Sequence, residues 1–319
     1  MQKMSLIVPC YNEELSLQYF FDTVVEFYND ILSKKVDLEL VFVNDGSKDN
    51  TWLHIKKLIK EKTNISIKAV NFSRNFGKES AIMAGLEVST GDCVITIDAD
   101  LQHPLETIPE MILKWNEGYK VVDGTKSSRG KESFLHKKFA GLFYNIISNA
   151  VGFNMKNASD FKLLDREVVD LLLTLKEKHV FYRGLTSWVG FPHTEVFFEV
   201  QEREFGETKW SFFKLTKYAL NNISSFSTAP MLIVTYIGVL FLIFSGILGI
   251  YTLVSYFLGA TVSGYATLTM LLLIIGSFNM IGLGIIGYYI SKIFEQVQER
   301  PNYIIQKVVS NEVKKCQNS

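Results

Sequence analysis

The chain has 319 residues, enough for two domains or for one large domain with an accessory part. Its 33 basic and 33 acidic residues balance, which argues against a nucleic-acid-binding protein, because such proteins usually carry a basic excess. The three cysteines, Cys10, Cys93 and Cys316, are scattered without a paired spacing. The sequence therefore indicates neither a disulfide framework nor a zinc site.

Strand and helix patterns alternate through residues 1–210. Strands are predicted over residues 4–8, 38–43, 65–72, 93–97 and 120–123, and helices over 15–32, 51–60, 78–88 and 105–116. This alternation predicts a mostly parallel sheet that is covered by helices on both faces. No G-x-G-x-x-G follows the first predicted strand, and no G-x-x-x-x-G-K-[ST] occurs in the sequence, so neither dinucleotide-binding nor P-loop chemistry is indicated.

Carboxylates follow three of the predicted strands. Glu13 lies in the loop after the first strand, Asp45 directly follows the second, and Asp98 and Asp100 follow the buried run 94–97. Because the carboxyl ends of parallel strands meet at one sheet edge, these side chains are expected to line a common ligand pocket. Two carboxylates one residue apart attract Mg²⁺ or Mn²⁺, which completes its shell with substrate phosphates. For this acidic pair alone, a solvated turn is the alternative.

Residues 218–291 contain no Asp, Glu, Lys, Arg or His. Within them, residues 231–258 and 266–290 are each long enough to cross a hydrocarbon core of roughly 30 Å. The loop between them is uncharged, whereas several lysines and an arginine follow the second segment. The sequence therefore predicts two transmembrane helices, with both termini and the large N-terminal part in the cytoplasm.

Two further segments combine an apolar stripe with lysines. Residues 134–151 carry Lys137 and Lys138 beside the stripe, and residues 210–226 have a similar composition just before the first span. Both are expected to lie in the membrane interface with their lysines at the level of the lipid headgroups. The alternative for residues 134–151 is an ordinary helix with one face in the core and one face in solvent.

Several motifs resemble those of the family 2 glycosyltransferases. They are Val-Pro-Cys-Tyr-Asn-Glu at 8–13, Val-Asn-Asp-Gly-Ser at 43–47 and Ile-Asp-Ala-Asp-Leu-Gln at 97–102. Asn-Phe-Gly-Lys at 75–78, Ser-Asp-Phe-Lys-Leu at 159–163 and Arg-Glu-Phe-Gly-Glu-Thr-Lys-Trp at 203–210 are similar to the polyprenyl-phosphate branch, which includes bactoprenol glucosyltransferases. The resemblance covers nearly the whole chain and implies a GT-A fold followed by two membrane helices.

The resemblance also implies a role for individual residues. The nucleotide sugar would be bound by Pro9, Tyr11, Glu13, Asp45, Lys78 and Lys209. The metal ion would be held by Asp98, Asp100 and Gln102, and the catalytic set would be Asp98, Asp100, Asp160 and Arg203. Arg203 and Lys209 would neutralise the leaving diphosphate.

The residues that bind the acceptor can be inferred from the chemistry of a lipid phosphate. This phosphate is anionic at neutral pH, so the enzyme must supply positive charge and orientation rather than a base. The candidates for binding it are Lys126, Arg129, Lys137 and Lys138. Related enzymes often carry arginine at the positions of Lys126 and Lys162. A lysine keeps the charge but lacks the two-pronged geometry of arginine.

The sequence thus predicts a cytoplasmic GT-A catalytic domain (1–210), a juxtamembrane helix (211–229), a two-helix membrane domain (230–291) and a cytoplasmic tail (292–319). The expected reaction is metal-dependent, inverting transfer of a hexose, glucose or N-acetylglucosamine from a UDP donor, to polyprenyl phosphate at the cytoplasmic membrane. A homo-oligomer, a tetramer by resemblance, and a separate flippase are expected partners. The alternatives are a processive polysaccharide synthase and a membrane-tethered sugar-nucleotide sensor without turnover.

Overall fold

A computed structural model describes residues 1–127, 159–175, 177–178, 180–199, 229–258 and 264–311. The chain divides into two compact units, one formed by Met1–Lys209 with Arg300–Ser319, and the other by Trp210–Glu299. Each unit is described by itself below. The two predicted interfacial segments, 134–151 and 210–226, lie outside the described residues.

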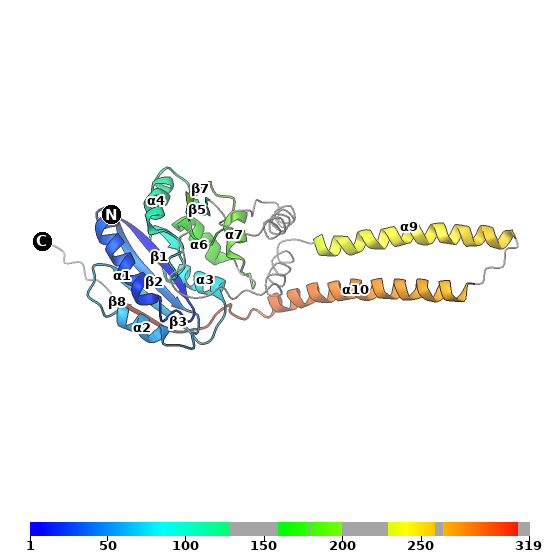
Figure 1. Cartoon of the computed structure of the whole chain (residues 1–319), viewed down its shortest axis with the longest axis horizontal. Coiled ribbons are helices and arrows are strands. Elements are labelled where there is room, and N and C mark those ends of the chain that lie inside the picture. Colours follow the sequence, from blue (N-terminus) through cyan, green and yellow to red (C-terminus); the bar gives the residue numbers. More distant parts are fainter. Residues whose placement is uncertain (128–158, 176, 179, 200–228, 259–263, 312–319) are drawn as a thin grey trace. The chain divides into compact units, whose positions relative to one another are not determined.

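The first unit is built on one mixed sheet (Figure 1). Its strands are β1 (Gln2–Cys10), β2 (Val36–Asn44), β3 (Ser66–Phe72), β4 (Cys93–Thr96), β5 (Val121–Lys126), β6 (Lys162–Asp165), β7 (His193–Phe198) and β8 (Ile305–Asn311), in the order β7-β5-β6-β4-β1-β2-β3-β8. The pairs β1–β2, β2–β3, β1–β4 and β5–β7 are parallel, whereas β6 and β8 run antiparallel to their neighbours. The prediction of a mostly parallel sheet is confirmed, and three antiparallel pairings are added to it.

Helices cover the sheet as the alternation predicted. They are α1 (Leu17–Phe27), which continues into a π-helical turn (Tyr28–Leu32), α2 (Thr51–Leu58), α3 (Lys78–Val88), α4 (Ile108–Asn116) after a 3-10 turn (Leu105–Thr107), α6 (Arg166–Thr174) and α7 (Tyr182–Trp188). The structure confirms the predicted bounds of α3 and shifts those of the other predicted helices by a few residues. Figure 1 shows α1 and α2 lying over one face of the sheet.

Side-chain alternation along the strands explains why both faces need helices. On α1, the buried residues Leu17, Phe20, Phe21 and Val24 share one helical face and pack with alternate residues of β1 and β2. The opposite face of β1 receives α3, where a Cβ added at Gly85 would lie 2.4 Å from Cγ2 of Ile7. The strands are therefore buried on both sides, as expected of a parallel sheet.

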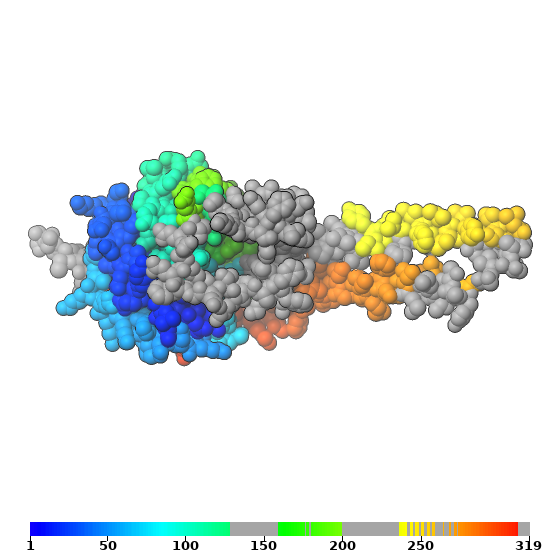
Figure 2. Space-filling view, in the orientation of Figure 1, coloured from blue at the N-terminus to red at the C-terminus, as the bar shows by residue number. Residues whose placement is uncertain are grey.

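The second unit contains two long helices, α9 (Ala229–Phe257) and α10 (Tyr265–Val297). Large apolar side chains are exposed along both helices. Figure 2 draws the described parts of the two helices in yellow and orange. Among the residues that the structure describes, one segment, Ile274–Val297 of α10, is long and apolar enough to cross a membrane by length and composition. The helices lie where the sequence predicted them, and the crossing of the membrane by both stays a prediction.

One strand of the sheet comes from an unexpected part of the chain. Residues after α10 were assigned to a cytoplasmic tail, yet β8 pairs antiparallel with β3 and forms an edge of the sheet. The first unit is therefore built from residues on both sides of the second unit in the sequence.

Candidate active site

The acidic residues that follow β1, β2 and β4 do meet at one edge of the sheet. Backbone hydrogen bonds continue the ladder past the strand ends, from the amide of Asp45 to the carbonyl of Cys10 (2.9 Å) and from that of Ile97 to the carbonyl of Ile7 (3.0 Å). Pro9 lies within β1, and Tyr11 just beyond it is 43% exposed. The strands therefore present a polar, partly open rim, which is where open α/β sheets bind ligands.

Asp45 organises the segment that leads into α3. Its buried carboxylate accepts hydrogen bonds from the side-chain amide of Asn75 (2.9 Å) and from the backbone amides of Phe76 (2.7 Å) and Gly77 (3.0 Å). Burial raises the pKa of Asp45, and the hydrogen bonds from Phe76 and Gly77 oppose that rise. Because residues 75–77 already occupy the Asp45 carboxylate with hydrogen bonds, its contact with a nucleoside stays a prediction.

Close backbone approach beside Asp45 requires a glycine. Gly46 has φ of +61°, and a Cβ there would lie 2.2 Å from the carbonyl carbon of Arg74. A side chain would therefore push the 74–77 segment away from the strand ends. Because α3 begins at Lys78, this packing also sets the position of the Lys78 ammonium.

A compact cluster of four charged side chains lies beyond the end of β4. The Lys78 ammonium is 2.6 Å from a carboxylate oxygen of Asp98 and 2.9 Å from one of Asp160. On its other side, Asp160 accepts two hydrogen bonds from Arg183, from Nε (2.7 Å) and from the terminal nitrogen (2.8 Å). Two cations and two anions therefore form one ionic cluster, and this two-pronged pairing is the strong form of the arginine–carboxylate contact.

The electrostatics of the cluster keep Lys78 and Asp160 charged. Burial would lower the pKa of Lys78, but the charges of Asp98 and Asp160 outweigh it and raise that pKa above its usual range. Burial would raise the pKa of Asp160, but Lys78 and Arg183 outweigh it and hold that pKa well below its usual range. Asp160 is thus an ionised carboxylate at neutral pH, fixed from two sides.

The backbone around Asp160 is fixed as well. The Thr96 hydroxyl, at the end of β4, donates to the carbonyl oxygen of Asp160 and lies 3.2 Å from the Tyr182 hydroxyl. Sequence reasoning did not identify Arg183, because it lies on the short helix α7 outside every recognised motif. The only signal available was its position next to the aromatic pair Phe181 and Tyr182.

The remaining predicted residues divide into two groups. Asp100 and Gln102 share the loop after β4, where the Gln102 amide donates to Asp100 (3.2 Å), and Lys126 is exposed at the end of β5. The others lie outside the described residues; they are Arg129, Lys137, Lys138, Arg203 and Lys209.

Lys162, one of the two positions where the resemblance led us to expect arginine, is a buried residue. Its ammonium is 3.1 Å from Asp123 and donates to the Thr186 hydroxyl (2.7 Å), and its side chain is fully buried. The Lys162 ammonium is therefore held by two buried partners within the protein.

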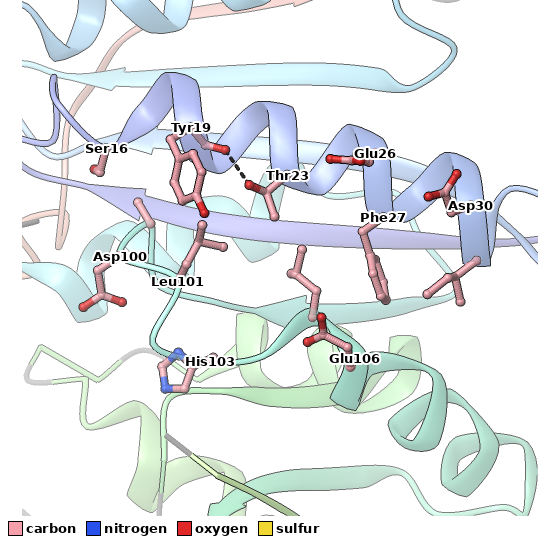
Figure 3. A pocket seen from close by; sticks show the side chains of 13 residues that line it. Ser16, Tyr19, Thr23, Glu26, Phe27, Asp30, Asp100, Leu101, His103 and Glu106 are labelled. Atoms are coloured by element: carbon pink, nitrogen blue, oxygen red, sulfur yellow. Dashed lines mark hydrogen bonds between the residues drawn. The ribbon is translucent and has the colours of Figure 1, made fainter. Parts of the chain in front are cut away.

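A cavity of about 270 Å³ lies between α1 and the loop after β4 (Figure 3). Asp100 and His103 line it from the loop, and Tyr19 and Glu26 line it from α1. His103 is buried against the ring of Phe161 at 4.9 Å, and burial lowers its pKa, so its imidazole is neutral at pH 7.

These features belong to an open α/β fold with carboxylates at the carboxyl edge of its sheet, and the comparisons with known proteins name the family. Residues 5–171 match glycosyl transferase family 2, and the chain belongs to that family. An uncharacterized glycosyltransferase of Synechocystis is 40% identical over 95% of this chain and 94% of its own length. The prophage bactoprenol glucosyl transferase homolog of Escherichia coli is 40% identical over 96% of this chain and 99% of its own length. The SfII prophage-derived bactoprenol glucosyl transferase of Shigella flexneri is 39% identical over 96% and 98%. The mixed sheet is the GT-A architecture expected of this family.

Proposed function

We propose that this chain is an inverting glycosyltransferase that moves a hexose from a UDP-sugar, glucose or N-acetylglucosamine, to polyprenyl phosphate. The observation that carries the proposal is the cluster of Lys78, Asp98, Asp160 and Arg183 at the carboxyl edge of the sheet. The names of the nearly full-length bactoprenol relatives support the choice of acceptor. Inversion follows if the phosphate oxygen attacks the anomeric carbon from the face opposite the leaving UDP.

The oxygen ligands in the loop after β4 fit a hard divalent cation, Mg²⁺ or Mn²⁺. Among the described residues, no three side chains of His, Cys, Asp or Glu gather into a metal-binding group. Two carboxylates and one amide, from Asp98, Asp100 and Gln102, match instead a cation that keeps few protein ligands and takes its other ligands from substrate phosphates. When bound, such a cation supplies positive charge to the departing diphosphate.

The chain's own residues divide the remaining work. Asp160, ionised and fixed by Lys78 and Arg183, orients the acceptor or a sugar hydroxyl. Arg203 and Lys209 are the proposed contacts to the diphosphate. Lys78 is proposed to contact the nucleotide sugar as well. The proposed acceptor contacts are Lys126, Arg129, Lys137 and Lys138. Because a lipid phosphate is already anionic, no general base is required.

The membrane setting is part of the same proposal. The helices α9 and α10 are proposed to span the cytoplasmic membrane as a pair, with the catalytic unit and both termini in the cytoplasm. In sealed right-side-out vesicles, an added protease should then leave residues 1–210 intact, and cleavage there would contradict this orientation. A homo-oligomer and a separate flippase complete the proposed assembly.

The decisive experiment supplies purified chain with polyprenyl phosphate and a panel of radiolabelled nucleotide sugars. We expect one UDP-hexose to give a monoglycosylated lipid, and Asp98→Asn to abolish its formation without loss of folding. A long polymer as product would identify a processive synthase instead. Donor binding without any product in the presence of Mg²⁺ or Mn²⁺ would identify a sensor.

A further inference from the structure

The strand that follows the apolar helices, β8, contains an irregularity beside the carboxyl end of β3, at the sheet edge that carries Asp45 and Asp98. Asn71 of β3 pairs with Lys307, whereas the next residue, Phe72, pairs with Ile305. Gln306 is therefore the extra residue of a β-bulge in β8. Bulges occur at sheet edges and next to active sites, where they turn a side chain in a new direction.

The bulge turns Gln306 toward β3. Its side-chain oxygen accepts a hydrogen bond from the Asn71 amide (2.9 Å), and the Asn71 oxygen accepts one from the Asn44 amide (2.6 Å). The Asn44 oxygen in turn accepts from the Ser47 hydroxyl (2.5 Å). Asn44 and Asn71 are buried, so each depends on these partners to satisfy its polar atoms.

The series ends at Asn12, between the predicted donor residues Tyr11 and Glu13. The Asn12 backbone amide donates to the Ser47 hydroxyl oxygen (3.0 Å), and its side-chain oxygen accepts from the backbone amide of Lys48 (2.9 Å). Asn12 has φ of +57°, the left-handed region that residues other than glycine rarely adopt. These two hydrogen bonds hold it there, and so set the direction of the loop that carries Tyr11 and Glu13.

Residues just before β8 make a second contact, which reaches the 74–77 segment that precedes α3. The ring of Tyr303 stacks on Phe72 at 5.2 Å, and Phe72 meets the edge of Phe76 at 5.6 Å. The Tyr303 hydroxyl donates to Glu87 of α3 (2.6 Å). Phe76 belongs to the segment bound by Asp45, so the residues after α10 support both loops that border the donor edge.

We infer that the C-terminal strand is a positioning element of the donor site, and that Gln306 is its positioning residue. Gln306 touches no predicted substrate contact. It acts through Asn71, Asn44 and Ser47 on the conformation of Asn12. The inference rests on the proposed function, because the loop at Asn12 matters to catalysis only if it binds the nucleotide.

The test compares three variants of the full-length chain in detergent. Gln306→Leu removes the acceptor of the Asn71 hydrogen bond, Gln306→Glu keeps an acceptor oxygen at the same place, and Ser310→Ala alters another exposed position of β8. UDP affinity is measured by calorimetry, and hydrogen exchange by mass spectrometry over residues 10–16 and 44–50. Donor and lipid KM values are measured beside kcat.

We expect Gln306→Leu to weaken UDP binding and raise the donor KM by roughly three- to tenfold, the value of one hydrogen bond, with kcat and lipid KM near normal. Exchange at residues 10–16 should be faster in this variant. Gln306→Glu and Ser310→Ala should resemble the wild type. The melting temperature should fall by about 2–4 °C, the effect of one lost hydrogen bond in a domain of this size.

The outcomes separate this inference from the proposed function. If the wild type binds no UDP, the proposed function fails. If the wild type binds UDP and Gln306→Leu binds it equally well, or exchanges equally slowly at residues 10–16, the positioning role is wrong. Equal weakening by Gln306→Leu and Ser310→Ala would also overturn it, because the effect would then belong to the strand in general.

Discussion

Arg183 offers the sharpest test of the charged cluster, because it contacts Asp160 through two hydrogen bonds and was not anticipated by any motif. In Arg183→Lys the positive charge stays, but one ammonium replaces the two-pronged guanidinium. The loss of one charge-assisted hydrogen bond costs about 1.5–3 kcal/mol. If that energy serves to orient Asp160 in the transition state, kcat falls by roughly 10- to 150-fold.

The assay is steady-state transfer from the UDP-sugar to polyprenyl phosphate, with UDP binding measured in parallel. UDP affinity should stay within about twofold of the wild type, since a catalytic-step interaction lowers kcat without lowering ground-state binding. Arg166→Lys is the matched control. Arg166 donates to the carbonyl oxygen of Gly91 (2.8 Å) and the Ser89 hydroxyl (3.1 Å), before β4 begins. It should therefore leave transfer near normal.

A double-mutant cycle with Asp160→Asn decides whether the reasoning holds. If Arg183 acts through Asp160, Arg183→Lys should have almost no further effect in the Asp160→Asn background. Independent, multiplicative losses would refute the assignment.

Removal of the guanidinium in Arg183→Ala should also let the pKa of Asp160 rise, because Lys78 alone then opposes the effect of burial. The acidic limb of the pH–rate profile should accordingly move to higher pH.

Three further predictions follow from the site and the core. Asp100→Asn should abolish transfer in a folded chain, and EDTA should silence the wild type until Mg²⁺ or Mn²⁺ is restored; full activity in EDTA would contradict the metal role. Hydrogen bonds from Ser5, Thr90 and Lys3 outweigh burial and lower the pKa of Glu39 from 4.5 to about 2. Urea unfolding should therefore show about 3 kcal/mol of stabilisation from Glu39 above pH 4.5, lost as the pH falls through 2 and absent in Glu39→Gln. Arg203→Ala should weaken donor use with any acceptor, whereas Lys137→Ala with Lys138→Ala should raise only the lipid KM; loss of UDP affinity in the double variant would reverse that assignment.

Local sequence patterns predicted the central strands, the helices between them and the sheet edge at which the acidic residues meet. The continuous apolar run before Asp98 identified the central strand β4, and the helical spacing after Gly77 gave the bounds of α3. The meeting of Asp45 and Asp98 at one edge followed from the parallel order, because consecutive parallel strands expose the same ends.

The rest depended on partners that are remote in sequence. β8 has a partly exposed, mixed pattern that indicates a strand weakly by itself, and its pairing with β3 joins residues more than 230 positions apart. Arg183 became recognisable only when α7 placed it beside Asp160. The path from Gln306 to Asn12 required a bulge, and bulges depend on the register of two strands rather than on either sequence alone.

The charge balance of the cluster limits what its members can do in the reaction. Lys78 and Arg183 are matched by Asp98 and Asp160, so these four side chains contribute no net charge to the donor edge. A sugar nucleotide brings an anionic diphosphate that becomes more negative as the sugar leaves, and that charge has to be met where it develops. In the proposed mechanism, neutralisation of the diphosphate therefore falls to the divalent cation and to Arg203 and Lys209, while the cluster is proposed to hold Asp160 ionised and oriented. Removal of Arg203 should accordingly impair departure of UDP, and removal of Arg183 should impair alignment of the acceptor.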